Sequence, residues 1–215
     1  MSRGRFITLE GIEGAGKSTV AKFAVAWLGR HNVAVRLTRE PGGTPLAERL
    51  RQMVLERGTE TVSPATETLL MFAARGLHVQ NVIRPALERG EWVVCDRFTD
   101  ATRAYQGSGR GVDSSLIETL ARVVHPDVQP DCTLLLDLPP AHGLIRARSR
   151  AGGGADRFEA ETVEFFERVR AGYLELARRE PERFHVIDAA APLMEVEHRV
   201  AAALARLSPP ARARK

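Results

Sequence analysis

The chain has 215 residues, of which 44% are hydrophobic and 27% charged, a composition typical of one soluble domain and not of a disordered protein. No apolar run approaches the roughly 18 residues that a membrane-spanning helix needs. No apolar segment with a small-residue cleavage site opens the chain, so we expect a cytoplasmic protein with no membrane partner. Two cysteines, Cys95 and Cys132, are too few for a disulfide framework or a zinc site, and we expect buried, reduced thiols.

The net charge of +4 is concentrated at the end of the chain. Arg212, Arg214 and Lys215 follow a Pro-Pro pair, and without them basic and acidic residues are nearly balanced. A basic nucleic-acid-binding face is therefore not indicated, and we expect no nucleic-acid partner. We interpret residues 209–215 as a flexible basic tail and residues 1–208 as a single domain.

Apolar segments rich in β-branched residues alternate with segments of helical periodicity. The predicted elements, in chain order, are a strand at 6–10, a helix at 17–30, a strand at 33–38, helices at 45–56 and 65–89, a strand at 92–96, a helix at 114–124, a strand at 132–138, helices at 141–150 and 160–179, a strand at 184–188 and a helix at 193–207. Strands separated by helices predict an α/β fold with a five-stranded parallel sheet between helical layers. Ligands of such sheets bind at the carboxyl ends of the strands.

The first such end carries a phosphate-loop motif. Residues 11–18, GIEGAGKS, match G-x-x-x-x-G-K-[ST] between a predicted strand and a predicted helix, as in the three-layer P-loop NTPase fold. Lys17 would reach the β- and γ-phosphates of ATP, and Ser18 would ligate Mg²⁺. The alternative is a glycine-rich turn without a ligand. The predicted ATP-binding residues are Gly11, Ile12, Glu13, Gly14, Ala15, Gly16, Lys17, Ser18 and Thr19.

The predicted strand at 92–96 ends in Asp96, and Arg97 follows it. Asp96 is suited to hold the magnesium ion together with Ser18, and Arg97 is suited to a second phosphate group. The pair therefore indicates a site for two phosphorylated ligands, unless Asp96 is only a cap and Arg97 a surface residue. The D-x-x-G and N-K-x-D motifs of GTPases occur nowhere in the sequence.

Several short motifs then occur in a fixed order. They are Glu13 in the loop, Arg39 to Thr44 (REPGGT), Phe72 to Arg75 (FAAR), Asp96 to Phe98 (DRF) and Ala104 to Gly107 (AYQG). With these motifs the chain resembles the bacterial thymidylate kinases from about residue 5 to 207. The resemblance implies transfer of the ATP γ-phosphoryl group to dTMP, giving dTDP and ADP for dTTP synthesis. It also implies Mg²⁺ as cofactor and a homodimer.

The resemblance assigns roles around the sugar and the phosphate of dTMP. Glu13 would approach the 3′-hydroxyl group, and Arg51 and Arg97 would hold the acceptor phosphate. Tyr105 would pack under the deoxyribose, where a 2′-hydroxyl group would clash. Arg51 has arginine neighbours at 49 and 57 that compete for the same role.

Further roles concern the base. Pro41 would line one face of thymine, Arg75 would donate to its O4 atom, and Thr102 and Gln106 would help to read the base edge. Without the other motifs, Arg75 would be a solvated helix residue, and residues 107–111, which follow Tyr105 and Gln106, would be a flexible loop.

The family commonly stacks thymine on an aromatic residue four positions before the helix arginine. Here that position is Met71, and Phe72 comes one residue later. One residue turns a helix side chain by about 100°. Either Met71 is a soft apolar platform, or the helix presents Phe72; the alternative for Phe72 is a place in the core.

Residues 146–159 combine four arginines with the triple glycine at 152–154, and the resemblance identifies this stretch as a mobile lid. The phosphate loop contains no arginine, so we expect one from the lid to stabilise the transferring phosphoryl group. We favour Arg150, with Arg148 and Arg157 as alternatives; a solvated basic loop is the non-catalytic interpretation. The predicted catalytic residues are Lys17, Asp96, Arg97 and Arg150.

Two rival functions differ in testable ways. Another nucleoside or nucleotide kinase would prefer a different acceptor in a panel of nucleotides. A nucleotide-dependent regulatory module acting through the basic tail would show salt-dependent retention on DNA that is lost on deleting residues 209–215.

Overall fold

A five-stranded parallel sheet forms the centre of the protein in the computed structural model, which describes residues 3–56, 60–150, 157–158 and 161–207. The strands lie in the order β2-β3-β1-β4-β5, which confirms the predicted α/β fold. Their bounds are β1 Phe6–Glu10, β2 Val35–Arg39, β3 Trp92–Asp96, β4 Cys132–Asp137 and β5 Phe184–Asp188.

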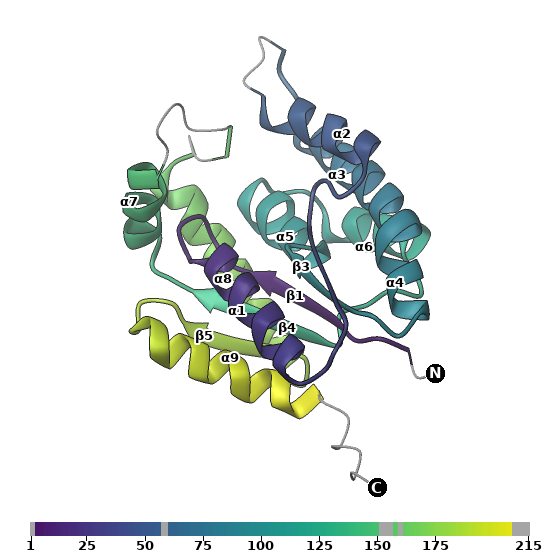
Figure 1. Ribbon diagram of the computed structural model, residues 1–215. Coiled ribbons are helices and arrows are strands. Elements are labelled where there is room, and N and C mark those ends of the chain that lie inside the picture. Colours follow the sequence, from purple (N-terminus) through teal and green to yellow (C-terminus); the bar gives the residue numbers. More distant parts are fainter. Residues whose placement is uncertain (1–2, 57–59, 151–156, 159–160, 208–215) are drawn as a thin grey trace, which may run out of the picture.

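Helices cover both faces of this sheet (Figure 1). The helical elements are α1 Lys17–Arg30, α2 Pro45–Leu55, α3 Pro64–His78, the π-helical segment η1 Val79–Ile83, α4 Arg84–Glu88, α5 Thr99–Thr102, the π-helical segment η2 Arg103–Gly109, α6 Ser114–Val124, α7 Pro140–Arg150, α8 Val163–Arg179 and α9 Leu193–Leu207. Helices α1 and α9 pack together on one face, and α4 and α8 contact the other. None of the described helices is long and apolar enough to cross a membrane.

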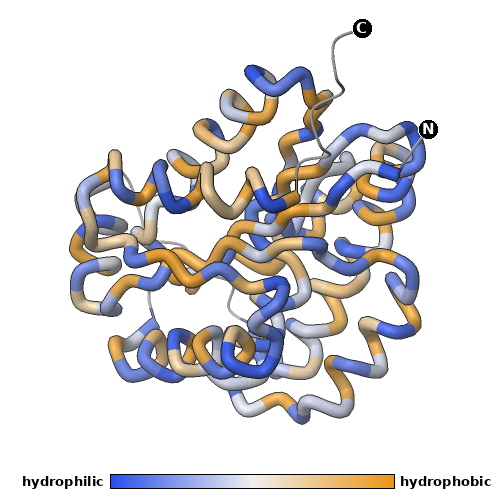
Figure 2. Tube along the Cα trace, turned by 90° about the horizontal axis from the view of Figure 1, so that it is seen from below, coloured by the Kyte–Doolittle hydropathy of each residue, from blue (hydrophilic) through white to orange (hydrophobic). Residues whose placement is uncertain are grey.

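The three central strands are buried along almost their whole length because both of their faces are covered. Every residue of β1 is buried, whereas each of the edge strands β2 and β5 has exposed positions. Figure 2 shows hydrophobic segments running through the middle of the molecule between helices in which hydrophobic and hydrophilic residues alternate. Since Leu9 pairs with Asp96 across β1 and β3, the phosphate loop after β1 and the Asp96-Arg97 pair are neighbours.

The predicted helix at 65–89 is interrupted in the structure. Helix α3 ends at His78, and the wider turn of η1 connects it to α4. Pro85 lies in the first turn of α4 and has no N–H group to donate to a carbonyl group one turn earlier, so a regular α-helix cannot continue through it.

A second difference is the helical stretch formed by α5 and η2, where the sequence predicts no helix. Its glycines allow close packing on α8 rather than flexibility. A Cβ atom at Gly109 would lie 2.6 Å from the Phe165 ring, and one at Gly172 would lie 2.3 Å from the Ser108 hydroxyl group. The stretch therefore forms a tight layer between the sheet edge and α8.

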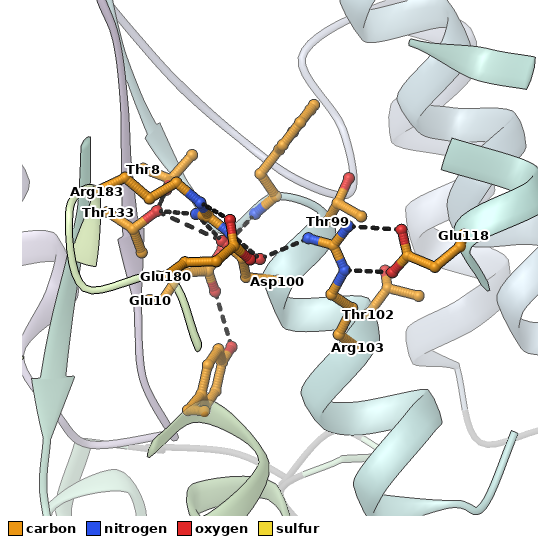
Figure 3. Close-up of polar contacts among 12 residues, drawn as sticks. Thr8, Glu10, Thr99, Asp100, Thr102, Arg103, Glu118, Thr133, Glu180 and Arg183 are labelled. Atoms are coloured by element: carbon orange, nitrogen blue, oxygen red, sulfur yellow. Dashed lines mark hydrogen bonds and ion pairs between the residues drawn. The ribbon is translucent and has the colours of Figure 1, made fainter. Parts of the chain in front are cut away.

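A buried ion network holds α5 and η2 in place (Figure 3). Asp100 accepts hydrogen bonds from both terminal nitrogens of Arg183, at 2.7 and 3.0 Å, and from Arg103 at 2.9 Å. Arg103 in turn binds Glu118 of α6 through two nitrogens. Although burial would raise the pKa of Asp100, the two arginines hold it below its usual value. Removing one partner would leave a buried charge without compensation, so the network fixes the start of α5.

Both cysteines are buried, reduced thiols, as expected. Cys95 lies in β3 and Cys132 in β4, on the two strands that flank β1. Neither is exposed to solvent.

Candidate active site

A cleft of about 570 Å³ opens at the carboxyl ends of β1, β2 and β3. This is the end of a parallel sheet at which ligands bind. Most of the side chains predicted to form a site line this cleft. They are Glu13, Lys17, Ser18, Pro41, Arg51, Met71, Arg75, Asp96, Arg97, Thr102, Tyr105 and Gln106, together with the loop residues Gly14 and Gly16. The other predicted loop residues, Gly11, Ile12, Ala15 and Thr19, are not among its lining residues.

The phosphate loop follows a backbone path that requires glycine. Gly11, Gly14 and Gly16 have φ angles of +135°, +76° and +91°, a region that other L-residues rarely occupy. A Cβ atom at Gly14 would lie 2.0 Å from the carbonyl oxygen of Gly143, but one at Gly16 would meet nothing within 4 Å. The loop is thus packed against the protein on one side and open to the cleft on the other.

Lys17 rests on the loop itself. Its Nζ atom donates to the carbonyl oxygens of Gly11, at 3.1 Å, and Ile12, at 3.0 Å. Burial, and secondarily the Arg97 charge, lowers the pKa of Lys17 to about 8. A polyanionic ligand would supply the opposite charge that stabilises the ammonium form.

Asp96 presents a free oxygen at the same end of the cleft. Its Oδ1 atom is buried without a hydrogen-bond partner in the described part of the chain, and Ser18 lines the same space. No group of three or more His, Cys, Asp or Glu residues gathers there or elsewhere among the described residues. Mg²⁺ usually keeps several waters and takes one or two protein oxygens plus phosphates, so this donor set fits that ion.

Arg97 is held by three side chains around it. Its Nη2 atom donates to Glu13, at 2.7 Å, and to the Tyr105 hydroxyl group, at 3.0 Å, and Nη1 donates to the Tyr173 hydroxyl group, at 3.3 Å. The Tyr105 hydroxyl group also donates to Glu13, at 2.6 Å. Arg97 has a φ angle of +71°, which turns its side chain from the end of β3 into the cleft.

Glu10, for which the sequence predicts no role, binds Tyr173, one of the partners of Arg97. It accepts from the Tyr173 hydroxyl group and from the backbone N–H of Phe98, both at 2.8 Å. Burial, and then the Asp100 carboxylate, raises the pKa of Glu10 to about 8. No local pattern in the sequence distinguishes this acid from other strand residues.

Arg75 is almost fully enclosed, with 3% of its surface exposed. Its Nε atom donates to Glu40, at 2.7 Å, and Nη2 donates to the Phe98 carbonyl oxygen and the Thr102 hydroxyl group, both at 3.1 Å. Its Nη1 atom is buried and has no hydrogen-bond partner among the described residues. Since Arg75 lines the cleft, this unused donor is available to a ligand.

Phe72 does not line the cleft; it is 2% exposed and packs with Ile117 and Ala121. Its ring lies 4.6 Å below the Arg75 guanidinium group, which it supports by a cation–π contact. Phe72 as a platform for a base is therefore corrected to a core residue. Met71 lines the cleft and is the remaining candidate.

Arg51 and Pro41 lie together at the entrance formed by the turn after β2. Arg51 Nη1 donates to the Pro41 carbonyl oxygen at 3.1 Å. The Glu40–Pro41 peptide bond is cis, and both Arg51 and Pro41 line the cleft.

Gln106 is positioned by Glu67 of α3. Glu67 is 1% exposed and accepts from Gln106, at 2.7 Å, from Arg110, at 2.8 Å, and from Arg157. Arg157, an alternative for the lid arginine, thus contacts Glu67, while its neighbour Phe158 lines the cleft. The side chains of Arg148 and Arg150 lie outside the described residues, as do residues 151–156 and 159–160.

Comparisons with known proteins agree with this geometry. Residues 9–200 match the thymidylate kinase family model. The chain is 53% identical over 204 residues to the thymidylate kinase of Pseudomonas fluorescens, covering 95% of this chain and 96% of that one. It is 54% identical over 196 residues to the thymidylate kinase of Alkalilimnicola ehrlichii, covering 91% and 90%. The crystal structure of thymidylate kinase from Ehrlichia chaffeensis superposes with a TM-score of 0.75 at 35% identity, over 94% of this chain and 99% of that one.

Proposed function

The chain belongs to the thymidylate kinase family and phosphorylates dTMP to dTDP, and from this premise we propose how its own residues divide the work. Two buried atoms that have no hydrogen-bond partner among the described residues carry the proposal: Arg75 Nη1 at one end of the cleft and Asp96 Oδ1 at the other. A ligand with a hydrogen-bond acceptor at one end and phosphates with a cation at the other satisfies both.

At the phosphate end, ATP binds residues 11–19 through converging N–H groups, at the N-terminus of α1. Lys17 leaves the two loop carbonyl oxygens and donates to phosphate oxygens instead. Ser18 and Asp96 hold Mg²⁺, which supplies positive charge to the phosphates when it is bound. This part of the proposal requires no movement of the strands.

dTMP occupies the remainder of the cleft. Arg97 and Arg51 hold its phosphate, Glu13 accepts from the 3′-hydroxyl group, and Tyr105 packs under the sugar. The base lies between Pro41 and Met71. Its polar edge faces Arg75 Nη1, with Thr102 and Gln106 beside it.

Catalysis then consists of positioning and charge stabilisation, with no covalent intermediate and no general base. Lys17 and Arg97 stabilise negative charge on the transferring group. A lid at residues 146–159 adds Arg150. We propose a single domain of residues 1–208 that includes the lid; the basic tail that we assign to residues 209–215 lies outside the described residues.

We also propose a homodimer formed through α3 and α6. These helices contact each other and leave large apolar side chains exposed, among them Leu69 at 52% and Val123 at 74%. An exposed apolar face of this kind is typical of a contact between subunits. Sedimentation analysis of Leu69→Glu and Val123→Glu variants tests it: a dimeric wild type with monomeric variants supports the face, and dimeric variants refute it.

An acceptor panel tests the main proposal. With ATP and Mg²⁺ in a coupled ADP assay, dTMP should be the best acceptor, dUMP weaker, and dCMP and purine nucleotides poor. Arg75→Ala should reduce the preference for dTMP over dCMP, whereas Arg84→Ala, which removes a surface arginine paired with Asp127, should not. A better acceptor than dTMP would favour another nucleoside monophosphate kinase.

A further inference from the structure

The pairing of Arg75 with Glu40 differs from three two-point arginine–carboxylate pairs in this protein. In Arg84–Asp127, Arg103–Glu118 and Arg170–Asp137, the Nε and Nη2 atoms of one arginine bind the two oxygens of one carboxylate. This two-point geometry is the preferred one for the two groups. Arg75 and Glu40 are joined instead by a single bond between Nε and Oε2.

The second oxygen of Glu40 is occupied by His78. The Oε1 atom lies 2.9 Å from His78 Nδ1, and the histidine is fully buried. An ionised carboxylate can only accept hydrogen bonds, so Nδ1 carries a hydrogen atom and donates a hydrogen bond to Glu40. Although burial would raise the pKa of Glu40, the Arg75 charge and the His78 hydrogen bond hold it below its usual value.

His78 is itself held from two sides. Its Nε2 atom lies 2.6 Å from the hydroxyl group of Thr38 at the end of β2. A Cβ atom at Gly43 would lie 2.4 Å from the ring, so glycine at that position lets the turn after Pro41 close over the histidine. The ring therefore has one orientation in which both nitrogens have partners.

The contact between His78 and Glu40 determines which bonds Arg75 Nη2 makes. Because Glu40 does not take both Nε and Nη2, Nη2 remains bonded to the Phe98 carbonyl oxygen and to Thr102. Those bonds set the rotation of the guanidinium plane, and with it the direction of the unpartnered Nη1 atom. A Glu40 carboxylate released by His78 would be free to form the two-point pair, which competes for Nη2 and turns the plane.

We propose that His78 is a positioning residue for base recognition. Because it binds one oxygen of the Glu40 carboxylate, only the other oxygen is left for Arg75, which therefore keeps its free Nη1 donor directed at the base. This rests on the proposed role of Arg75. It adds that selectivity among nucleotides depends on a histidine that touches neither substrate. Thr38 contributes by holding the far side of the ring.

Three variants at the histidine and its partner test the proposal. His78→Leu removes the donor, and we expect the preference for dTMP over dCMP, as a ratio of kcat/KM values, to fall about tenfold. KM for dTMP should rise while KM for ATP stays unchanged, since the phosphate end is remote. His78→Gln keeps an N–H donor of similar reach and should recover most of the preference. Thr38→Val should have a smaller effect in the same direction.

Thr8→Val is the matched control for Thr38→Val, because it removes a threonine hydroxyl group that is bonded to Thr133 inside the sheet. It should leave the preference unchanged, and thermal melting of each variant reports loss of fold separately. If Arg75→Ala abolishes the preference but folded His78→Leu retains the wild-type ratio, the inference about His78 is overturned and the role of Arg75 stands. If Arg75→Ala itself leaves the ratio unchanged, the proposed role of Arg75 fails first.

Discussion

The two ends of the cleft solve the problem of buried polar groups in opposite ways. At the base end, Arg75 donates to three groups on three different segments and leaves one atom unpartnered. At the phosphate end, Lys17 and Arg97 have provisional partners: two loop carbonyl oxygens for the former, Glu13 and two tyrosines for the latter.

The difference shows what each end must do. A base is read by a donor whose direction is fixed before the ligand arrives, because reorientation would weaken discrimination. Phosphates instead exchange partners with groups that are already charged, and a provisional carbonyl or carboxylate avoids an unsatisfied buried cation in the meantime. The base end is therefore preorganised, and the phosphate end is exchangeable.

The largest effect is expected at the exchangeable phosphate end. Lys17→Ala should abolish turnover, because the lysine supplies charge to the phosphates, yet it should leave the fold intact. Lys22→Ala, on the exposed side of the same helix, is the matched control and should retain wild-type rates. Near-normal turnover of Lys17→Ala in a steady-state ADP assay would remove the loop lysine from the mechanism.

Discrimination at the preorganised end comes next. Thymine O4 accepts a hydrogen bond, whereas cytosine presents an amino donor at that place, and Arg75 can only donate. The kcat/KM value for dCMP should be lower than that for dTMP by roughly 10⁴. Comparable values for the two nucleotides would contradict a fixed donor at this end.

A third test asks whether the exchangeable end is completed by the lid. Arginines that stabilise phosphoryl transfer contribute about 10³ or more in kcat. Arg150→Ala should lower kcat by at least about that factor, with a milder change in the KM for dTMP. A rise in KM alone would mean ground-state binding. No change would transfer the role to Arg148 or Arg157, and losing all three without effect would mean that the lid is not catalytic.

The smallest effect concerns Glu10 beneath Arg97. Its pKa is about 8 in the folded protein against 4.5 for the ordinary group, so the folded state binds more protons between these pH values. The contribution of Glu10 to the free energy of unfolding therefore falls as pH rises from 4.5 to 8, by at most about 1.4 kcal/mol per pH unit. Glu10→Gln removes this loss, and its stability relative to wild type should grow over that range. Urea titrations at pH 5, 6.5 and 8 measure this difference, and a pH-independent difference would contradict the shift.

Much of the fold could be predicted from the sequence because its signals are local. Strands β1, β3 and β5 and helices α1, α6 and α9 have the predicted bounds, since each strand is a short apolar segment and each of these helices begins after a glycine, an aspartate or a proline. The stretch α5–η2 was missed because glycines that indicate a loop were needed for packing against α8. The break after His78 follows from Pro85, whose effect extends back by a full turn.

The site residues also fall into those with a local sequence signal and those without one. Lys17, Ser18, Asp96 and Arg97 follow directly from strand ends and motif spacing. The choice between Met71 and Phe72 depends on which side of α3 faces the core, and spacing alone left it open. Glu40 and His78 are 38 residues apart, and Glu67 binds Arg157 across 90 residues, so no local pattern could have paired them.

The two buried thiols can report on how often the central sheet opens. Both thiols are buried, and burial raises the pKa of Cys132 to about 12 and that of Cys95 well above its usual value, so we expect neither to react with alkylating reagents while its strand stays paired. Each strand is hydrogen-bonded to β1, the strand that leads into the phosphate loop. The labelling rate of the native protein therefore measures how often the central sheet opens. A nucleotide that bridges the ends of β1 and β3 should slow the modification of Cys95, so the labelling rate of this buried side chain would report ligand binding.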